Sequence, residues 1–467
     1  MIYISAVGMV NALGNSPDEI AANLTAGVAP GMHARTGWLQ GLPEAVLGGV
    51  EGELPPIPDA FAAHRTRNNQ LLLAALAQIQ PAVDEAIARV GRDRVAVVLG
   101  TSTSGLDEGD EHVRHMTHGE ASTRWQYPQQ ELGDPSRFLA SWLQLEGPAY
   151  TISTACSSSA RAMIGGKRLI EAGLVDIAIV GGADTLSRMP VNGFNSLESF
   201  SPTLCEPFGR DRRGITIGEA AALMVLSWEP ADVALLGTGE SSDAYHISAP
   251  HPQGEGAIRA IAQALNEAGM QPQDIGYINL HGTATPLNDQ IESQVIHDLF
   301  GESVPCSSTK HLTGHTLGAA GITEAALSWL ILMRDLPLPP QDFARYAPDD
   351  TLAPFLNADG DLPGWYALEL MAQTVGVWSG WHRQQQGQDH IALGMVLGAR
   401  ELVCASGRFA AGLTLDITVK LLMQDERFGS FECAISANEE TLATGRVNTF
   451  QPSAEELTSL FNQGSNA

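Results

Sequence analysis

One cysteine stands where a strand is predicted to give way to a helix. Cys156 lies in the small-residue segment TISTACSSS, at the start of a helix predicted over 157–172. Free N–H groups at a helix N-terminus favour a thiolate, so we expect a lowered thiol pKa and a nucleophilic cysteine. A cysteine at such a junction is, taken alone, more often an inert core residue. That interpretation is kept for the remaining cysteines, Cys205, Cys306, Cys404 and Cys433.

Two histidines stand at similar strand–helix junctions. His281 directly follows an apolar strand predicted over 275–280, and His315 lies in a glycine-rich turn before another predicted helix. In α/β proteins such junctions gather at the mouths of binding sites. Two neutral imidazoles there could donate hydrogen bonds to an oxygen on which negative charge develops. A lone loop histidine is usually structural, and this is our expectation for His246, His251 and His311.

Three ordered motifs carry a family resemblance over about residues 1–345. TACSSS around Cys156, HGTATPLND from His281 and STKHLTGHTLGAAG around His315 resemble the signatures of β-ketoacyl-acyl-carrier-protein synthases of the elongating, Cys-His-His type. EPFGRD before Gly218-Glu219, and the segment SSDAYH, also match. The resemblance implies an α/β, thiolase-like fold, a layered α-β-α-β-α sandwich. It also implies a homodimer, or a heterodimer with a related synthase subunit.

The resemblance also implies a reaction. An acyl chain is moved from acyl carrier protein to Cys156, and malonyl-carrier then loses CO₂ and attacks the acyl thioester. Both substrates are thioesters carried on the phosphopantetheine of acyl carrier protein, and no metal or other cofactor is expected. By resemblance, Lys310 and Glu324 form an ion pair that orients His315. Chain-length-factor subunits normally lack the nucleophile, and initiating synthases carry Asn at the place of His315, so both are disfavoured.

A second candidate site lies in the apolar segment 365–381, which we expect to be a helix buried all round. Glu369 is its only charged residue. It is either a buried acid with a raised pKa, suited to general acid catalysis, or a solvated first-turn residue that complements the helix dipole. The segment LPGWYALELMAQT resembles the central helix of hot-dog-fold 3-hydroxyacyl-carrier-protein dehydratases, which implies the acid. Together, the two families resemble enzymes of aryl polyene biosynthesis.

The chain departs from both families. No N-x-F-G-F-G-G-x-N segment follows His315, although in synthases this segment supplies an oxyanion-hole N–H and an aromatic gate. We therefore expect the second synthase half-sheet to lack two strands. The dehydratase half lacks its opening strands and P-H motif, and His382 and His390 lie on the wrong side of the helix to replace it. Two alternatives follow: an inactive fusion that binds carrier protein or an intact synthase, and a residual dehydratase.

The distribution of apolar, Pro/Asp-rich and polar segments along the sequence predicts four regions. Apolar runs ending in Gly alternate with helical stretches over 1–340, which predicts α/β layering. Residues 341–361 form a Pro/Asp-rich linker. Residues 362–453 predict a partial α+β hot-dog unit, with alternating strands at 413–421 and 431–435. Residues 454–467 form a polar tail.

Composition restricts the partners. The net charge is −27, so binding to nucleic acid or to anionic membrane is not expected. The N-terminus does not resemble a signal peptide, and the longest apolar run, 325–333, is too short to span a bilayer. We expect a reduced, cytoplasmic protein. Four residues are candidates for binding the acidic carrier protein, with ordinary surface arginines as the alternative: Arg65, Arg67, Arg212 and Arg213.

Overall fold

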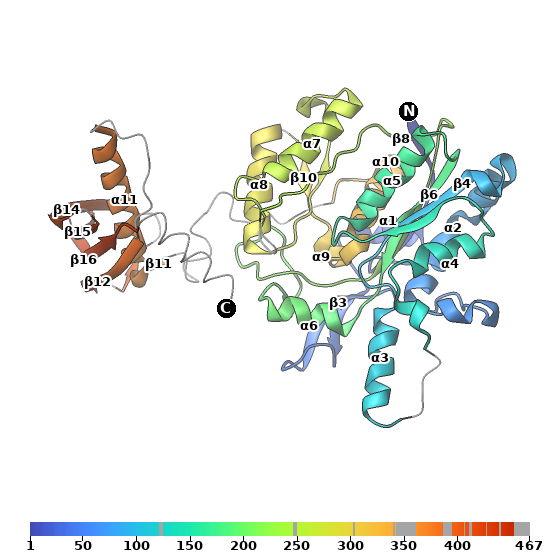
Figure 1. Cartoon of the computed structure of the whole chain (residues 1–467), viewed down its shortest axis with the longest axis horizontal. Helices are drawn as coiled ribbons and strands as arrows, with labels where there is room; N and C mark the ends of the chain where they lie inside the picture. Colours follow the sequence, from blue (N-terminus) through green and yellow to red (C-terminus); the bar gives the residue numbers. More distant parts are fainter. Residues whose placement is uncertain are drawn as a thin grey trace. The chain divides into compact units, whose positions relative to one another are not determined.

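The computed structural model divides the chain into two compact units, 1–348 and 349–467 (Figure 1). It describes residues 1–120, 125–245, 250–301, 304–339, 341, 361–385, 395–405, 407–410, 413–425, 427–438 and 440–452. Most of the predicted linker, the predicted tail, His246 and His390 lie outside the described residues. The three borders between the four predicted regions stay predictions.

Unit 1 is built on a six-stranded sheet in the order β5-β4-β6-β7-β1-β8. β4 pairs parallel with β5 and β6, whereas β7 pairs antiparallel with β6 and β1. β4, β6 and β7 are buried along their whole length, as continuous apolar strands covered on both faces should be. The strands are β1 (Ile2–Val10), β4 (Val95–Gly100), β5 (Ala149–Ile152), β6 (Ile177–Asp184), β7 (Ala220–Ser227) and β8 (Val233–Leu235).

Helices cover both faces of this sheet. α2 (Arg67–Val90) and α4 (Asp134–Trp142) pack on one face. α1 (Pro17–Ala26), α5 (Ser158–Glu171) and α10 (Ala320–Arg334) pack on the other. Among the described residues, α2 and the segment Leu317–Arg334 are long and apolar enough to cross a membrane by length and composition alone. Because both helices pack a stripe of apolar residues against the sheet, they are core helices of this unit.

The second half of unit 1 repeats the first only in part. β8, α7, β9, α8, β10 and α10 follow one another as β1, α2, β4, α4, β5 and α5 do. β9 and β10 form a two-stranded parallel sheet, and no described segment corresponds to β6 and β7. Among the described residues the second sheet thus contains β9 and β10, and the expected lack of two strands stays a prediction. The bounds are α7 (Glu255–Ala268), β9 (Ile278–Asn279), α8 (Pro286–Phe300), β10 (Cys306–Ser307) and α9 (Lys310–Thr313).

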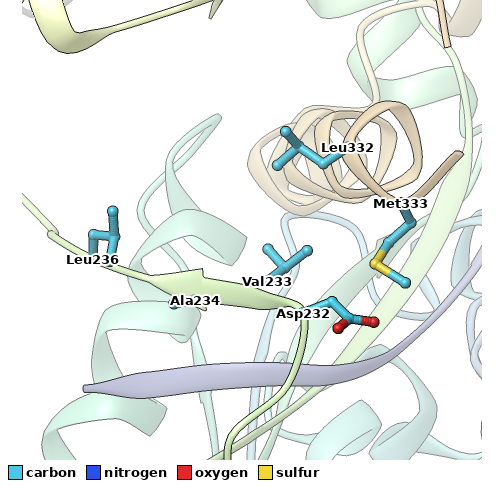
Figure 2. A pocket seen from close by; sticks show the side chains of 6 residues that line it. All are labelled: Asp232, Val233, Ala234, Leu236, Leu332 and Met333. Atoms are coloured by element: carbon cyan, nitrogen blue, oxygen red, sulfur yellow. The ribbon is translucent and has the colours of Figure 1, made fainter. Parts of the chain in front are cut away.

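Smaller elements complete unit 1. They are β2 (Met32–Thr36), β3 (Glu44–Gly48), α3 (Leu106–Thr117), α6 (Arg188–Ser196) and the 3₁₀ helices η1 (Asp59–His64), η2 (Arg92–Arg94), η3 (Tyr127–Gln130), η4 (Pro272–Asp274) and η5 (Leu317–Ala319). A hollow of about 400 Å³ opens between β8 and the end of α10, lined by Asp232, Val233, Ala234, Leu236, Leu332 and Met333 (Figure 2). None of these six residues belongs to the predicted catalytic set.

Unit 2 packs one helix on an antiparallel sheet, as predicted. α11 (Ala367–Gln385) follows the 3₁₀ helix η8 (Gly364–Tyr366). The sheet order is β12-β16-β15-β14, and β11 pairs with β13. The strands are β11 (Leu362–Pro363), β12 (Met395–Cys404), β13 (Arg408–Phe409), β14 (Asp416–Gln424), β15 (Phe428–Ala437) and β16 (Glu440–Phe450).

The prediction that the unit 2 helix is buried all round is wrong. Ala367, Met371 and Val375 are buried, but Val377 is 73% exposed and Trp381 is 55% exposed. One helix lying on one sheet buries a single stripe of its surface, whatever the composition of its other face.

Candidate active site

Cys156 sits in a tight turn between β5 and α5. It directly precedes Ser157, the cap of α5. Ala155 has φ 52°, a left-handed conformation that costs energy for a residue with a side chain. The first turn of α5 lies close against the end of β4, since a Cβ on Gly100 would be 2.3 Å from the Ser159 nitrogen. The small residues around Cys156 thus serve close backbone packing.

The structure brings the three predicted groups together. The Cys156 sulfur and one ring nitrogen from each of His281 and His315 all lie within 4.8 Å of one another. The centroids of the two imidazole rings are 5.3 Å apart, and the ring planes are nearly perpendicular. His281 follows β9, and His315 lies between α9 and η5. Residues up to 159 positions apart in the sequence therefore form one cluster.

Lys310 contacts His281, which corrects the expectation that it orients His315. The side chain of Lys310 is 2% exposed, and its ammonium is paired with Glu324. The same Nζ lies 3.3 Å from Nδ1 of His281. An ammonium can only donate, so Nδ1 of His281 is the acceptor and the proton of a neutral ring sits on Nε2.

A backbone N–H fixes the ring of His315. The Leu317 N–H donates to Nδ1 of His315 over 3.0 Å, which again leaves the ring proton on Nε2. His315 is 2% exposed, and burial lowers its pKa to about 3. Burial, followed by the charge of Lys310, holds the pKa of His281 well below its usual range. Both rings are therefore neutral hydrogen-bond donors at neutral pH.

The expected lowering of the Cys156 pKa is wrong for the resting site. Burial raises the pKa of this thiol, and the charge of Lys310 offsets the rise only in part. Protein atoms replace the water that would solvate a thiolate, and this loss outweighs the favourable position near a helix N-terminus. Cys156 therefore rests as a thiol.

Two acids of α8 that the sequence reasoning missed hold the turn of His281. The carboxylate of Glu292 accepts the His281 N–H at 2.6 Å and the Gly282 N–H at 2.8 Å. Burial raises the Glu292 pKa to about 7. Asp289, one turn earlier, accepts the Ala284 N–H at 3.1 Å. Their spacing of three residues at the start of a helix was the available signal, because it places both acids on one face.

The orientation of both rings argues against a metal site. Three ligating atoms this close satisfy the distances for a metal ion. A metal-bound histidine, however, normally donates its other ring N–H to an acceptor. Here Nδ1 of His281 faces the Lys310 ammonium and Nδ1 of His315 faces the Leu317 N–H, so both face donors. The donor set fits a substrate oxygen better than a cation.

The four arginine candidates for carrier binding differ in their hydrogen-bond partners and in their exposure. Arg67 donates to the buried carboxylate of Glu219 at 2.6 Å, and Arg212 donates to two backbone carbonyls with its side chain 9% exposed. These two arginines therefore stabilise the fold. Arg65 donates to a backbone carbonyl and to an exposed aspartate. Arg213 is exposed.

Glu369 is not the buried acid that one interpretation required. It is exposed in the first turn of α11, where its carboxylate accepts a hydrogen bond from Gln373 at 2.7 Å. The structure thus agrees with the other interpretation, a solvated residue at the positive end of the helix.

Comparisons with known proteins agree with this geometry. Family models match the β-ketoacyl synthase N-terminal domain at 1–231, its C-terminal domain at 233–342, and the ApeP dehydratase at 344–462. The chain is 32% identical over 295 residues to 3-oxoacyl-[acyl-carrier-protein] synthase 2 of Staphylococcus aureus (strain COL), covering 59% of this chain and 71% of that protein. The protein of the same name from Synechocystis sp. is 32% identical over 284 residues, and the match covers 56% of this chain and 68% of that protein.

Solved structures extend the comparison to the fold. A chain in the complex of ketosynthase ApeO with its chain length factor ApeC, from Xenorhabdus doucetiae, is 52% identical with a TM-score of 0.74. That match covers 97% of this chain and 98% of the other. The expected thiolase-like fold is confirmed, together with the dehydratase-like region. The chain belongs to the β-ketoacyl synthase family and carries an ApeP-like dehydratase segment behind its synthase domains.

Proposed function

We propose that this protein is a 3-oxoacyl-acyl-carrier-protein synthase of type II fatty-acid or aryl polyene synthesis. It performs a decarboxylative Claisen condensation of an acyl thioester with malonyl-acyl-carrier protein. The observation that carries the proposal is that the Cys156 thiol and one ring nitrogen from each of two neutral imidazoles lie within 4.8 Å of one another. The synthase relatives favour this function over an inactive binding partner or a residual dehydratase.

Each step uses a group already in place. The Cys156 sulfur attacks the acyl thioester carbonyl, the bond to the carrier's sulfur breaks, and the thiol proton ends on that sulfur. Malonyl-carrier then loses CO₂, and the electron pair of the broken C–C bond forms an enolate. His281 and His315 donate hydrogen bonds from Nε2 to its oxygen. The enolate carbon attacks the acyl carbonyl, and Cys156 leaves and regains a proton.

The missing glycine-rich segment affects these steps unequally. Loss of one oxyanion-hole donor typically costs 10²–10³-fold in rate. In the family that donor serves the acyl carbonyl, whereas the enolate is held by the histidines. Decarboxylation of malonyl-carrier should therefore be better preserved than the full condensation.

The partners follow from the same reaction. The substrates arrive on the phosphopantetheine of acyl carrier protein, and the chemistry uses no other cofactor. Of the four candidates, Arg213 is exposed and Arg65 pairs with an exposed aspartate, so we propose these two for contact with an acidic carrier. We further propose pairing with a related synthase subunit in the cytoplasm, supported by the ApeO–ApeC complex of the relative.

Radiolabelled acyl-carrier protein tests the nucleophile. We expect label on Cys156, none on the Cys156→Ala variant, and unchanged labelling of Cys306→Ala, which removes another partly buried cysteine. Label that persists in Cys156→Ala would rule out the assignment. His281→Ala and His315→Ala should each lower malonyl-carrier decarboxylation by 10²–10³-fold. Folded protein with neither activity would support the binding-partner alternative.

A further inference from the structure

A buried carboxylate that takes no part in this chemistry lies behind the site. Asp184 ends β6 and is 0% exposed. Its Oδ1 accepts from Thr101 Oγ1 at 2.7 Å, the Ser102 N–H at 2.8 Å, and the Thr103 N–H and Oγ1 at 2.7 Å each. Its Oδ2 accepts the Ala319 N–H and the Ser102 N–H, each at 3.1 Å. Every contact is a donor, so the group acts as an acceptor throughout.

This carboxylate joins two distant parts of unit 1. Thr101, Ser102 and Thr103 follow β4, whereas Ala319 ends η5, 135 residues after Asp184. η5 lies directly on the carboxylate, because a Cβ on Gly318 would be 2.8 Å from Oδ2. The Ala319 N–H also donates to the Thr316 carbonyl at 3.0 Å within its own turn, so Asp184 supplies the second acceptor, from outside η5.

η5 is the element that sets the ring of His315. Its first residue, Leu317, has φ 50°, a strained conformation for a residue with a side chain. In that conformation the Leu317 N–H points at Nδ1 of His315. Strained residues keep their conformation only when neighbouring contacts hold them. Two residues further on, the Ala319 N–H bonds to Asp184 and provides such a contact.

We propose that Asp184 is a positioning residue that holds η5 so that the Leu317 N–H keeps His315 in its Nε2–H form. The inference rests on the proposed function for its effect on catalysis, but its effect on the ring does not depend on activity. Asp184 acts on the substrate only through His315.

Replacement by Asn isolates the contact with η5. An amide has one acceptor oxygen, and the greater number of donors around Oδ1 will hold it there. The NH₂ group then faces the Ala319 N–H, donor against donor, and pushes η5 away. The same substitution at Asp176, just before the other end of β6 and paired on the surface with Arg94, is the matched control.

Two measurements test the proposal. Imidazole ¹H–¹⁵N correlation spectra of histidine-labelled protein, with His315→Ala to assign the signal, should show the Nε2–H form in the wild type and in Asp176→Asn. Asp184→Asn should show a mixture of tautomers. Decarboxylation of malonyl-carrier should fall about ten-fold in Asp184→Asn, but less than two-fold when the substitution is added to His315→Ala. Asp184→Glu, which keeps the acceptor, should restore most of the rate.

An unchanged tautomer in folded Asp184→Asn overturns the proposal, as does an equal loss of rate in both backgrounds. If Asp184→Asn does not fold, Gly318→Ala perturbs the same contact from the η5 side and must give the same mixture of tautomers. A wild type without any decarboxylation would contradict the proposed function, while the spectra would still decide the role of Asp184.

Discussion

The depressed pKa of His315 predicts how the stability of unit 1 responds to acid. The pKa is about 3 in the folded protein and 6.5 for an ordinary histidine. Between these values the unfolded chain binds a proton that the folded chain does not. The contribution of the neutral His315 ring to the free energy of unfolding is therefore fully present above pH 6.5 and is lost as the pH falls toward 3. From pH 7 to pH 5 the loss is about 2 kcal/mol, and in total it approaches about 5 kcal/mol.

The assay must follow unit 1 alone, because a single unfolding curve would mix two units. Met9 on β1 and Met224 on β7 are both 0% exposed. Their oxidation by peroxide across a urea series, read by mass spectrometry, reports when this sheet opens. We expect the free energy of unfolding of the wild type to fall about 2 kcal/mol more than that of His315→Asn between pH 7 and pH 5.

Comparison of the two proteins cancels the titrating groups that do not interact with His315. His281 does interact with it, since His315 contributes to lowering the His281 pKa. His297→Asn, at an exposed position of α8, is the control and should keep the pH dependence of the wild type. If His315→Asn is as acid-sensitive as the wild type, the imidazole is already protonated or solvated in the folded state. The account of His315 as a neutral donor would then fail.

Three further predictions concern buried and exposed acids. Lys310→Met should destabilise unit 1 by about 3–5 kcal/mol in the same oxidation assay, because it leaves Glu324 unpaired, and adding Glu324→Leu should recover most of the loss. Decarboxylation should decline below about pH 7 as Glu292 is protonated and the turn of His281 loosens, and a pH–rate profile of Glu292→Gln should lack that decline. Glu369→Gln should change the stability of unit 2 by less than about 0.5 kcal/mol, measured at a buried methionine there, and a larger change would contradict its solvated position.

The positions of the three reacting groups could be predicted because each is encoded locally. Apolar runs define the strands that end before Cys156 and His281, and small residues with glycine mark the turns that follow. The α/β layering follows from the same local patterns, whereas the expectation of a reduced second sheet came from the resemblance to the synthase family. The sequence could not show which ring Lys310 contacts, because that depends on distances between segments 29 residues apart.

Burial was the property that the sequence predicted least well. Apolar composition suggested that the helix of Glu369 was covered all round, but a single sheet covers a single face. Arg67 was a candidate for carrier binding, but it pairs with Glu219, whose burial 152 residues away could not be seen in the sequence. The thiol pKa of Cys156 was misjudged for the same reason, since a helix terminus is visible in the sequence and desolvation is not.

The resting site holds its reacting groups uncharged, and this determines where charge appears. Burial keeps both imidazoles neutral and keeps Cys156 a thiol, beside the paired side chains of Lys310 and Glu324. Charge therefore develops only as a substrate reacts, first on sulfur and then on the enolate oxygen. Donors that are fixed before the charge appears need no reorganisation, so they stabilise it more than mobile water would. Such a site needs groups that hold the rings in place, which explains why Lys310 and the Leu317 N–H both face an Nδ1 atom.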